Sequence, residues 1–283
     1  MTFRTRFAPS PTGPLHLGHA YSALLAYDMA MAEGGEFLLR IEDIDQTRAR
    51  PEWEAQIYDD LAWLGLWWPE PAMRQSDRQP AYDAALDLLW QHRLLYPCRC
   101  ARADIAAAVS APQEGVPLHG PDGVIYPGTC RGLAARTGPR PTDIPLRLDM
   151  RMATEIIDIT LFFEETGVSP AGISIDAETL PRDVGDIVLA RRDMGTSYHL
   201  SVVVDDAAQG ITHVVRGQDL FEATKIHVVL QGLLGLTTPI YHHHPLIRDD
   251  RGKRLAKRDD ARAISLFRSE GKKPEDIRFM LGL

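Results

Sequence analysis

The 283-residue sequence has little cysteine, no long apolar run and no secretory leader. Its three cysteines are an odd number, which excludes a disulfide framework paired within the chain and indicates a reducing compartment. No stretch approaches the ~18 apolar residues that a membrane span needs, and the N-terminus lacks the apolar core of a signal peptide. We therefore expect a cytoplasmic protein without a membrane partner.

Lysine is also scarce: the chain has five lysines and 26 arginines, and four of the lysines follow residue 252. The formal net charge of −8 argues against a protein that coats nucleic acid non-specifically, because phosphate binding needs a positive field. The window 248–258 nevertheless holds six basic and two acidic residues. This local charge of +4 singles the window out from an otherwise acidic chain.

What is present is typical of a globular protein. A hydrophobic fraction of 45% with 25% charged residues excludes a disordered chain. At ~150 residues per domain, the length predicts about two structural units.

The N-terminal part of the chain alternates between strand and helix patterns. Period-2 alternation predicts strands over 3–7 and 37–42, and a run without proline predicts a helix over about 16–33. Pro51 is placed to begin a second helix, and Ser76 is placed to cap a third. This order of elements indicates a parallel sheet with crossover helices.

The pattern breaks over 110–145, where seven prolines and six glycines favour loops. Alternation returns at 146–150, and strands over 186–190 and 211–216 are expected to start a second α/β half, followed by a helix that Asp219 caps. We therefore predict an α/β protein with a doubly wound, Rossmann-like parallel sheet, split by an inserted loop-rich domain and followed by a short helical segment. The expected boundaries are 1–97 and 183–245 for the two halves of the sheet domain, 98–182 for the insert, and 246–283 for the C-terminal segment.

An eleven-residue string, Pro9 to His19, lies between the first expected strand and helix. A helix N-terminus at this edge of a doubly wound sheet offers N–H groups to phosphate. His16 and His19 fall on one face of the first turn, where both rings can donate to phosphate oxygens, and Gly18 permits a close approach. The string resembles the HIGH signature of class I aminoacyl-tRNA synthetases, in the form with PSPTG before it that marks the glutamyl and glutaminyl branch.

The basic window contains residues 252–258, which resemble the mobile KMSKS loop of the same family. The resemblance implies that Arg254, Leu255 and Lys257 bind ATP with its Mg²⁺, together with the histidine turn. Positive charge suits that position because negative charge develops on the leaving pyrophosphate. Lys257 is the expected catalytic cation, whereas Ala256 stands where the signature has serine, so that hydroxyl contact is absent.

Three further segments resemble the glutamyl branch position by position: 40–45, 197–206 and 215–220. Two arginines suit a dicarboxylic amino acid, because a guanidinium group holds a carboxylate bidentately. The resemblance implies that Arg6 and Arg216 hold the side-chain carboxylate of glutamate. The residues expected to bind glutamate are Arg6, Ala8, Ser10, Glu42, Tyr198 and Arg216.

The three cysteines, Cys98, Cys100 and Cys130, lie within 33 residues of one another. Three thiolates with one further ligand would make a closed tetrahedral zinc site, and Tyr126 and His119 are both candidates for the fourth ligand. By spacing alone, free buried thiols are an equally good interpretation. The arrangement resembles the Cys, Cys, Tyr, Cys site of the glutamyl-Q tRNA(Asp) synthetases, which implies one structural zinc ion in the insert.

Three consecutive histidines, 242–244, suggest a metal site at first sight. Adjacent residues on a strand point to opposite faces, so three in a row cannot converge on one ion. We expect a core or adenine-pocket role at most.

Only 25 residues follow Arg258, fewer than the ~40 that an independent domain needs, so we expect no anticodon-binding domain. This fits the truncated paralogues of the branch, the glutamyl-Q tRNA(Asp) synthetases. They activate L-glutamate with ATP without needing tRNA and transfer it to queuosine in the anticodon loop of tRNA(Asp). The expected protein is such a ligase, acting as a monomer. The alternatives are a fragment of a glutamyl-tRNA synthetase that charges tRNA(Glu), and a non-catalytic paralogue that binds tRNA or amino acid.

Overall fold

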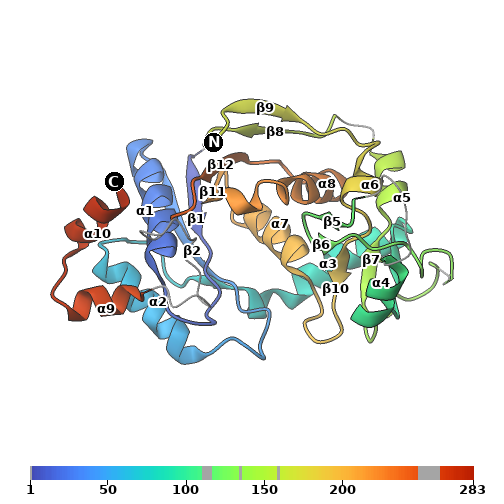
Figure 1. Ribbon diagram of the computed structural model, residues 1–283, viewed down its shortest axis with the longest axis horizontal. Helices are drawn as coiled ribbons and strands as arrows, with labels where there is room; N and C mark the ends of the chain where they lie inside the picture. The colour runs from blue at the N-terminus through green and yellow to red at the C-terminus, as the bar shows by residue number, and fades with distance from the viewer. Residues whose placement is uncertain (1, 110–116, 134–135, 158–159, 248–261) are drawn as a thin grey trace.

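A computed structural model describes residues 2–109, 117–133, 136–157, 160–247 and 262–283 of the chain (Figure 1). Its N-terminal part is a parallel strand-helix-strand unit. Strand β1 (Arg4–Phe7) leads through a Pro-rich turn into helix α1 (Leu17–Ala32), and β2 (Glu36–Ile41) returns parallel to β1. Strand β3 (Met73–Arg74) adds to β2, also in parallel. The strands and helix expected in this region are confirmed.

A second parallel unit follows later in the chain. Strand β11 (His213–Gly217) pairs with β12 (Ile240–His244), and helix α8 (Thr224–Leu234) connects them. Strand β8 (Phe162–Glu165) joins the other side of β12 in parallel, and β9 (Ala171–Ser174) pairs antiparallel with β8.

The two units meet along β1 and β11. The backbone N–H of Thr212 donates to the carbonyl of Arg4 at 3.0 Å, and the Arg4 N–H donates to the Thr212 hydroxyl at 2.8 Å. Val214 and Val215, neighbours on β11, belong to different hydrophobic clusters because they point to opposite faces. The parallel strands therefore separate two cores, one around α1 and one around α7 (Tyr198–Ala208) and α8.

A third sheet lies beside them and is antiparallel. Strand β7 (Leu146–Leu148) is its centre, with β4 (Leu95–Pro97) and β10 (Val188–Ala190) on its two sides. A strand near 186–190 is confirmed, but its ladder is with β7 and not with the second parallel unit. A two-stranded hairpin, β5 (His119–Gly120) and β6 (Gly123–Val124), completes the strands of the described residues. The protein is thus an α/β fold with parallel and antiparallel sheets.

Two expected helix caps are wrong, although both helices form. Ser76 lies in the 3₁₀ turn η1 (Gln75–Arg78), and its backbone N–H donates to the Asp43 carboxylate at 2.8 Å, so α3 begins later. Asp219 likewise lies in η2 (Gln218–Leu220), and α8 begins at Thr224. In each case a 3₁₀ turn uses the residues that local spacing assigned to a cap. The remaining helices are α2 (Pro51–Trp63), α3 (Gln79–Gln91), α4 (Arg102–Val109), α5 (Met150–Ile156), α6 (Leu180–Asp183), α9 (Ile264–Ser269) and α10 (Pro274–Leu281).

The C-terminal helices pack against the N-terminal unit. Figure 1 shows α10 beside α1, at the opposite end of the molecule from α4 and α5 of the insert. Ile264, Phe267 and Ile277 join the hydrophobic cluster of α1, and Arg278 pairs with Asp28 at 2.6 Å. The predicted helical tail is confirmed for residues 262–283. In the part of the chain that the structure describes, no helix is long and apolar enough to span a bilayer.

Candidate functional site

The histidine turn forms the N-terminus of α1. His16 is the N-cap, and its Nδ1 accepts the backbone N–H of Gly18 at 3.1 Å. Nδ1 of His19 accepts the backbone N–H of His16 at 3.1 Å, and the two rings stack with centroids 3.7 Å apart. Because Nδ1 is an acceptor in both rings, the proton of each neutral ring lies on Nε2. Each histidine therefore has its donor on the side away from the backbone.

Gly18 is required by this ring arrangement. A Cβ at residue 18 would lie 3.0 Å from Cε1 and 3.2 Å from Nδ1 of His16, closer than ordinary van der Waals contact. Any side chain there would push the His16 ring away from the cap.

The segment after β12 returns to the same turn. The backbone N–H of Ile264 donates to the Leu15 carbonyl at 2.8 Å, and Ala263 forms an antiparallel bridge with His16. On the other flank, His244 Nε2 lies 2.7 Å from Ser22 Oγ of α1. Arg254, Leu255 and Lys257 lie outside the described residues. Both flanks of their segment nevertheless contact the N-terminal half of α1.

Four charged side chains meet at the carboxyl ends of β1 and β2. Arg6 donates from Nε and Nη2 to the two carboxylate oxygens of Asp206 at 3.0 and 3.3 Å. Arg40, which is fully buried, donates from Nη1 to Asp206 at 2.6 Å and from Nη2 to Glu42 at 3.2 Å. Burial raises the pKa of Asp206, but Arg6 and Arg40 outweigh burial and hold it below its usual value. Burial raises the pKa of Glu42.

The Pro-rich turn brings Ser10 to this cluster. The backbone N–H of Glu42 donates to the Pro9 carbonyl at 3.0 Å, and the Ser10 carbonyl accepts the N–H of Thr12 at 2.8 Å. Ala8 and Ser10 are half-buried between β1 and this turn. The turn thus lies at the end of β2 beside Glu42.

Arg216 is held on three sides at the end of β11. Its Nε donates to His243 Nε2 at 3.1 Å, and its Nη1 lies 3.1 Å from His227 Nδ1. Nη2 donates to Thr224 Oγ1 at 2.7 Å and to the Leu220 carbonyl at 3.2 Å. The guanidinium group is therefore oriented by the strand, by η2 and by α8 before any substrate arrives.

These contacts determine the tautomer of His243. Arginine can only donate, so His243 Nε2 must be an acceptor and the ring proton must lie on Nδ1. Nδ1 is 2.5 Å from the Glu165 carboxylate, which accepts that proton as a hydrogen bond. Burial, and after it the charge of Arg216, lower the pKa of His243 to about 4 although Glu165 opposes both, so the ring is neutral at pH 7.

The same argument applies to His227. Its Nδ1 accepts from Arg216, so its proton lies on Nε2 and points to His199 Nδ1 at 3.1 Å. His199 then donates from Nε2 to the Asp122 carboxylate at 3.2 Å. Burial lowers the pKa of His227 well below its usual value, and Arg216 adds to this. A directed chain of hydrogen bonds therefore runs from Arg216 through two histidines to the β5–β6 hairpin.

Tyr198 lies among the charged groups at the N-terminus of α7. Burial raises its pKa, the charges of Arg216 and Arg6 lower it, and the charge of Glu42 raises it. Its ring meets the edge of His227 with centroids 5.9 Å apart. The structure thus brings Arg6, Glu42, Tyr198 and Arg216 to one place, as expected for a common site.

Sequence reasoning missed the residues that hold this site together. The main ones are Arg40 and Asp206, which link β1, β2 and α7, and Thr224, His227 and His243, which surround Arg216. Only the position of Arg40 could be predicted from neighbouring residues, because alternation on the strand places its side chain on the same side as Glu42. Asp206 lies 200 residues from Arg6 along the chain, and Thr224, His227 and His243 lie 8 to 27 residues from Arg216 without a spacing that predicts the contact.

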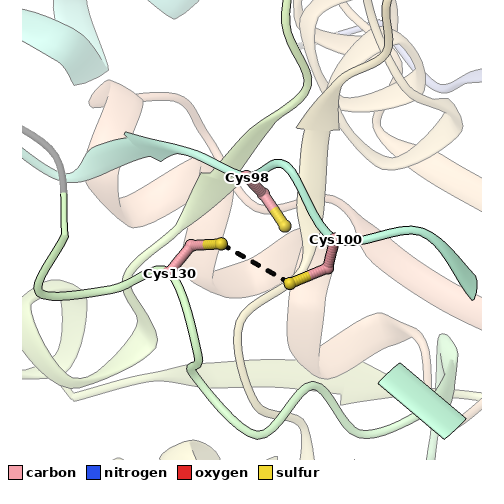
Figure 2. A group of neighbouring side chains, drawn as sticks. All are labelled: Cys98, Cys100 and Cys130. Carbon is pink, nitrogen blue, oxygen red and sulfur yellow. Dashed lines mark hydrogen bonds between the residues drawn. The ribbon is translucent and has the colours of Figure 1, made fainter. Parts of the chain in front are cut away.

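The three cysteine side chains converge at the start of the insert. Figure 2 shows the sulfur atoms pointing toward one another, and the three Sγ atoms lie within 4.8 Å of one another. Cys100 Sγ is 3.5 Å from Cys130 Sγ, and Tyr126 Oη is 3.5 Å from Cys98 Sγ and 3.3 Å from Cys100 Sγ. Burial raises the pKa of Cys130, but hydrogen bonds from Tyr126 and its neighbours outweigh burial and lower it to about 7.

This cluster has the dimensions of a four-coordinate metal site. Zn–S bonds of ~2.3 Å and Zn–O bonds of ~2.0 Å at tetrahedral angles imply S···S and S···O separations of ~3.8 and ~3.5 Å. The Cys100–Cys130 separation of 3.5 Å and the Tyr126 separations of 3.5 and 3.3 Å are close to these values, and all three Sγ atoms lie within 4.8 Å of one another. Tyr126 is therefore the better fourth donor, whereas His119 is exposed and pairs with Val124 in the hairpin. Arg147 stacks on the Tyr126 ring at 3.9 Å and donates to Cys98 Sγ at 3.3 Å, which offsets thiolate charge.

The three consecutive histidines have separate partners, as alternation on a strand requires. His242 lies 3.0 Å from Thr166 Oγ1, His243 contacts Glu165 and Arg216, and His244 contacts Ser22. They do not converge on one point.

The fold, the histidine turn and the charged cluster agree with one protein family. The family model of the catalytic domain of class I tRNA synthetases (E and Q) matches residues 2–116 and 170–283. The chain belongs to this family. The unmatched stretch, 117–169, includes the β5–β6 hairpin, two of the predicted zinc ligands and β7.

Several curated relatives within this family share one name. A protein of Rhodobacter capsulatus named glutamyl-Q tRNA(Asp) synthetase is 62% identical over 280 residues, which cover 99% of both chains. Proteins of the same name from Deinococcus radiodurans and Geobacter sulfurreducens are 44% and 42% identical and are covered to 86% and 78% of their length.

Among solved structures, the chain resembles a glutamate tRNA ligase from Elizabethkingia meningosepticum in complex with its amino acid. The TM-score is 0.77 at 27% identity, and the match covers the whole of this chain. The chain spans 61% of the length of that ligase.

Proposed function

We propose that the protein activates L-glutamate with ATP, without needing tRNA, and transfers the glutamyl group to queuosine in the anticodon loop of tRNA(Asp). The observation that carries this proposal is the 62% identity to the Rhodobacter capsulatus glutamyl-Q tRNA(Asp) synthetase over 99% of both chains. The convergence of Arg6, Glu42, Tyr198 and Arg216 beside the histidine turn supports it chemically. We take the protein to act as a monomer in the cytoplasm, where its tRNA is found.

In this proposal two arginines select the dicarboxylic substrate. Arg216 is oriented by His243, His227 and Thr224, so its charge and the remaining N–H of Nη1 are prepared for the side-chain carboxylate. Arg6 supplies a second positive charge while Asp206 holds it in place. Glu42 and Tyr198 orient the amino group, and Ala8 and Ser10 line the pocket.

Activation is a displacement at the α-phosphorus of ATP. A carboxylate oxygen of glutamate forms a bond to that phosphorus, and the bond to the bridging oxygen breaks as pyrophosphate leaves with its electron pair. His16 and His19 donate from Nε2 to the phosphates, Gly18 leaves room for the nucleotide, and Lys257, with Arg254 and Leu255, binds ATP from the C-terminal segment. Mg²⁺ bound to ATP neutralises phosphate charge.

Transfer of the glutamyl group uses a hydroxyl group of a diol as the nucleophile. Queuosine has a cyclopentene cis-diol that resembles the terminal ribose diol of tRNA. One hydroxyl oxygen bonds to the acyl carbon, AMP leaves with the electron pair of the anhydride bond, and the phosphate of AMP takes the proton. A site built to present an activated carboxyl to a diol can therefore act on an anticodon loop.

We also propose that the chain divides as its patterns predicted. The halves 1–97 and 183–245 form a Rossmann-like catalytic domain, 98–182 forms the insert, and 246–283 forms the loop and helical segment. The bonds between Arg4 and Thr212 support one continuous parallel sheet. The ladders of β8 with β12 and of β10 with β7 hold the insert to the second half on both sides.

One zinc ion is proposed to be bound by Cys98, Cys100, Tyr126 and Cys130. A site with four protein ligands has no open position, so its role is to fix the insert. We expect Cys130→Ser to lower the zinc content from about one equivalent to well below half, because a hydroxyl is a much poorer zinc ligand than a thiolate. His119→Ala, the matched control, should retain zinc. Elemental analysis of protein purified without added metal measures both, and zinc equal in Cys130→Ser and wild type would contradict the site.

The function is tested in two steps. Exchange of labelled pyrophosphate into ATP should depend on glutamate and proceed without tRNA, and its absence would favour a non-catalytic binder, for which Ala256 is the motivating residue. Labelled glutamate should then be transferred to tRNA(Asp) containing queuosine and not to tRNA(Asp) from cells that lack queuosine. Glutamate on tRNA(Glu) alone would identify the alternative, a glutamyl-tRNA synthetase fragment.

A further inference from the structure

Two adjoining hollows lie beside the cysteine cluster, because both are lined by Cys98 and Cys100. Their volumes are about 620 and 530 Å³, within the ~300–1,000 Å³ that small-ligand sites occupy. They share Cys98, Cys100, Pro145 and Arg192, so they form one continuous surface.

Arginine dominates the charge of this surface. The larger hollow is lined by Arg102, Arg147, Arg191 and Arg192, and the smaller one adds Arg99. These five arginines face three aspartates. The local balance is therefore positive in a chain whose formal net charge is −8.

Four of these arginines are exposed and lack an ion-pair partner among the described residues. Arg99, Arg102, Arg191 and Arg192 are exposed and form no ion pair within the described residues. By contrast, Arg182 and Arg278 elsewhere on the surface are each paired with an aspartate. Four neighbouring unpaired guanidinium groups repel one another, and a bound anion would remove that cost.

The lining of the larger hollow is also partly apolar. It includes Ile105, Val124 and Val188, and its Asp122 is already bonded to His199. Apolar side chains beside guanidinium groups suit a nucleotide of a single-stranded segment, because the base can pack against the apolar groups while the phosphodiester meets the arginines.

We propose that this arginine hollow binds the sugar-phosphate backbone of a single-stranded RNA loop, with Arg102, Arg191 and Arg192 as its phosphate contacts. The inference rests on the proposed function, since the RNA would be the tRNA substrate. It adds where on the molecule that substrate is held: beside the cysteine cluster, in hollows whose lining includes none of the residues assigned to glutamate and ATP.

The test compares two variants of equal charge. Arg102→Gln/Arg191→Gln/Arg192→Gln removes the hollow's three contacts, and Arg48→Gln/Arg93→Gln/Arg151→Gln removes three exposed arginines outside it. Binding of fluorescein-labelled tRNA(Asp) is followed by anisotropy from 0.05 to 0.3 M salt. Single-stranded phosphate contacts contribute ~0.7 each to the slope of log K against log salt. The hollow variant should lose about 2 from that slope and bind about 100-fold more weakly at 0.1 M salt, while the control variant keeps the wild-type slope.

Pyrophosphate exchange measured on the same preparations separates this proposal from the proposed function. Exchange at the wild-type rate with weakened tRNA binding supports the hollow. Equal slopes for the two variants would overturn it, as would a wild-type protein that does not bind tRNA at 0.05 M salt. If the wild-type protein fails to glutamylate tRNA(Asp), the proposed function is wrong, whatever the slopes of log K against log salt. If the triple variant loses exchange and therefore its fold, Arg192→Gln alone, which touches both hollows, should lower the slope by about 0.7.

Discussion

Arg216→Gln is expected to lower kcat/KM for glutamate in pyrophosphate exchange by about 10- to 100-fold. Four of the five guanidinium N–H groups already donate to His243, His227, Thr224 and Leu220, so the variant loses one charge-assisted hydrogen bond to the substrate carboxylate, worth ~1.5–3 kcal/mol. At ~1.4 kcal/mol per factor of ten, this one bond accounts for the expected decrease. Because the carboxylate is held equally before and during the reaction, most of the effect should appear in KM rather than in kcat.

Arg216→Lys should recover little of this loss. It keeps the charge but cannot donate to His243, His227 and Thr224 at once, so its ammonium group is not oriented. Arg268→Gln, which removes an exposed arginine paired with Asp59, is the control and should change kcat/KM less than twofold. Equal activity of Arg216→Lys and wild type would contradict the assignment.

The chain of histidines offers a second check on the same site. His227→Leu should raise KM for glutamate, because Arg216 loses the acceptor that fixes Nη1. His227→Asn provides a side-chain oxygen near the position of Nδ1 and should restore part of the affinity. A role in packing alone would make the two variants alike in KM.

Asp206→Asn is expected to reduce the free energy of unfolding by about 3–5 kcal/mol, the cost of breaking a buried ion pair by removing one partner. Asp206 accepts hydrogen bonds from both Arg6 and Arg40, and Arg40 is fully buried. The amide would leave two buried guanidinium groups with Glu42 as the nearby carboxylate. Denaturant titration at pH 7 measures the change, and it should appear in the midpoint without a change in slope.

Asp183→Asn is the matched control, because Asp183 forms an exposed ion pair with Arg182 and should cost less than about 1 kcal/mol. The pH dependence gives a further test. Asp206 has a lowered pKa in the folded protein, so the unfolded chain takes up the proton first as pH falls below about 4. The stability contributed by Asp206 is therefore present at neutral pH and lost in acid. Wild type and Asp206→Asn should approach each other there; a constant difference would contradict this account.

Prediction from the sequence succeeded where neighbouring residues decide the outcome. Alternation over 3–7 and 37–42 and the uninterrupted run after His16 correspond to β1, β2 and α1. Prediction failed where a tertiary contact competed with a local signal. Ser76 stands at the spacing expected of a helix cap, but its backbone N–H is bonded to the Asp43 carboxylate. The strand near 186–190 pairs with β7, a strand of the insert.

The sequence by itself determined which residues carry charge, thiol and imidazole groups, and which short segments become strands or helices, because those properties depend on composition and on periods of two to four residues. It also identified the family through its histidine turn. Only the tertiary structure decided that Asp206 joins Arg6 and Arg40, that two neutral histidines orient Arg216, and that Tyr126 rather than His119 completes the thiol cluster. The physical reason is that ion pairs and hydrogen bonds act over a few ångströms, and Asp206 lies 200 residues from Arg6 along the chain and 3.0 Å from it in the fold.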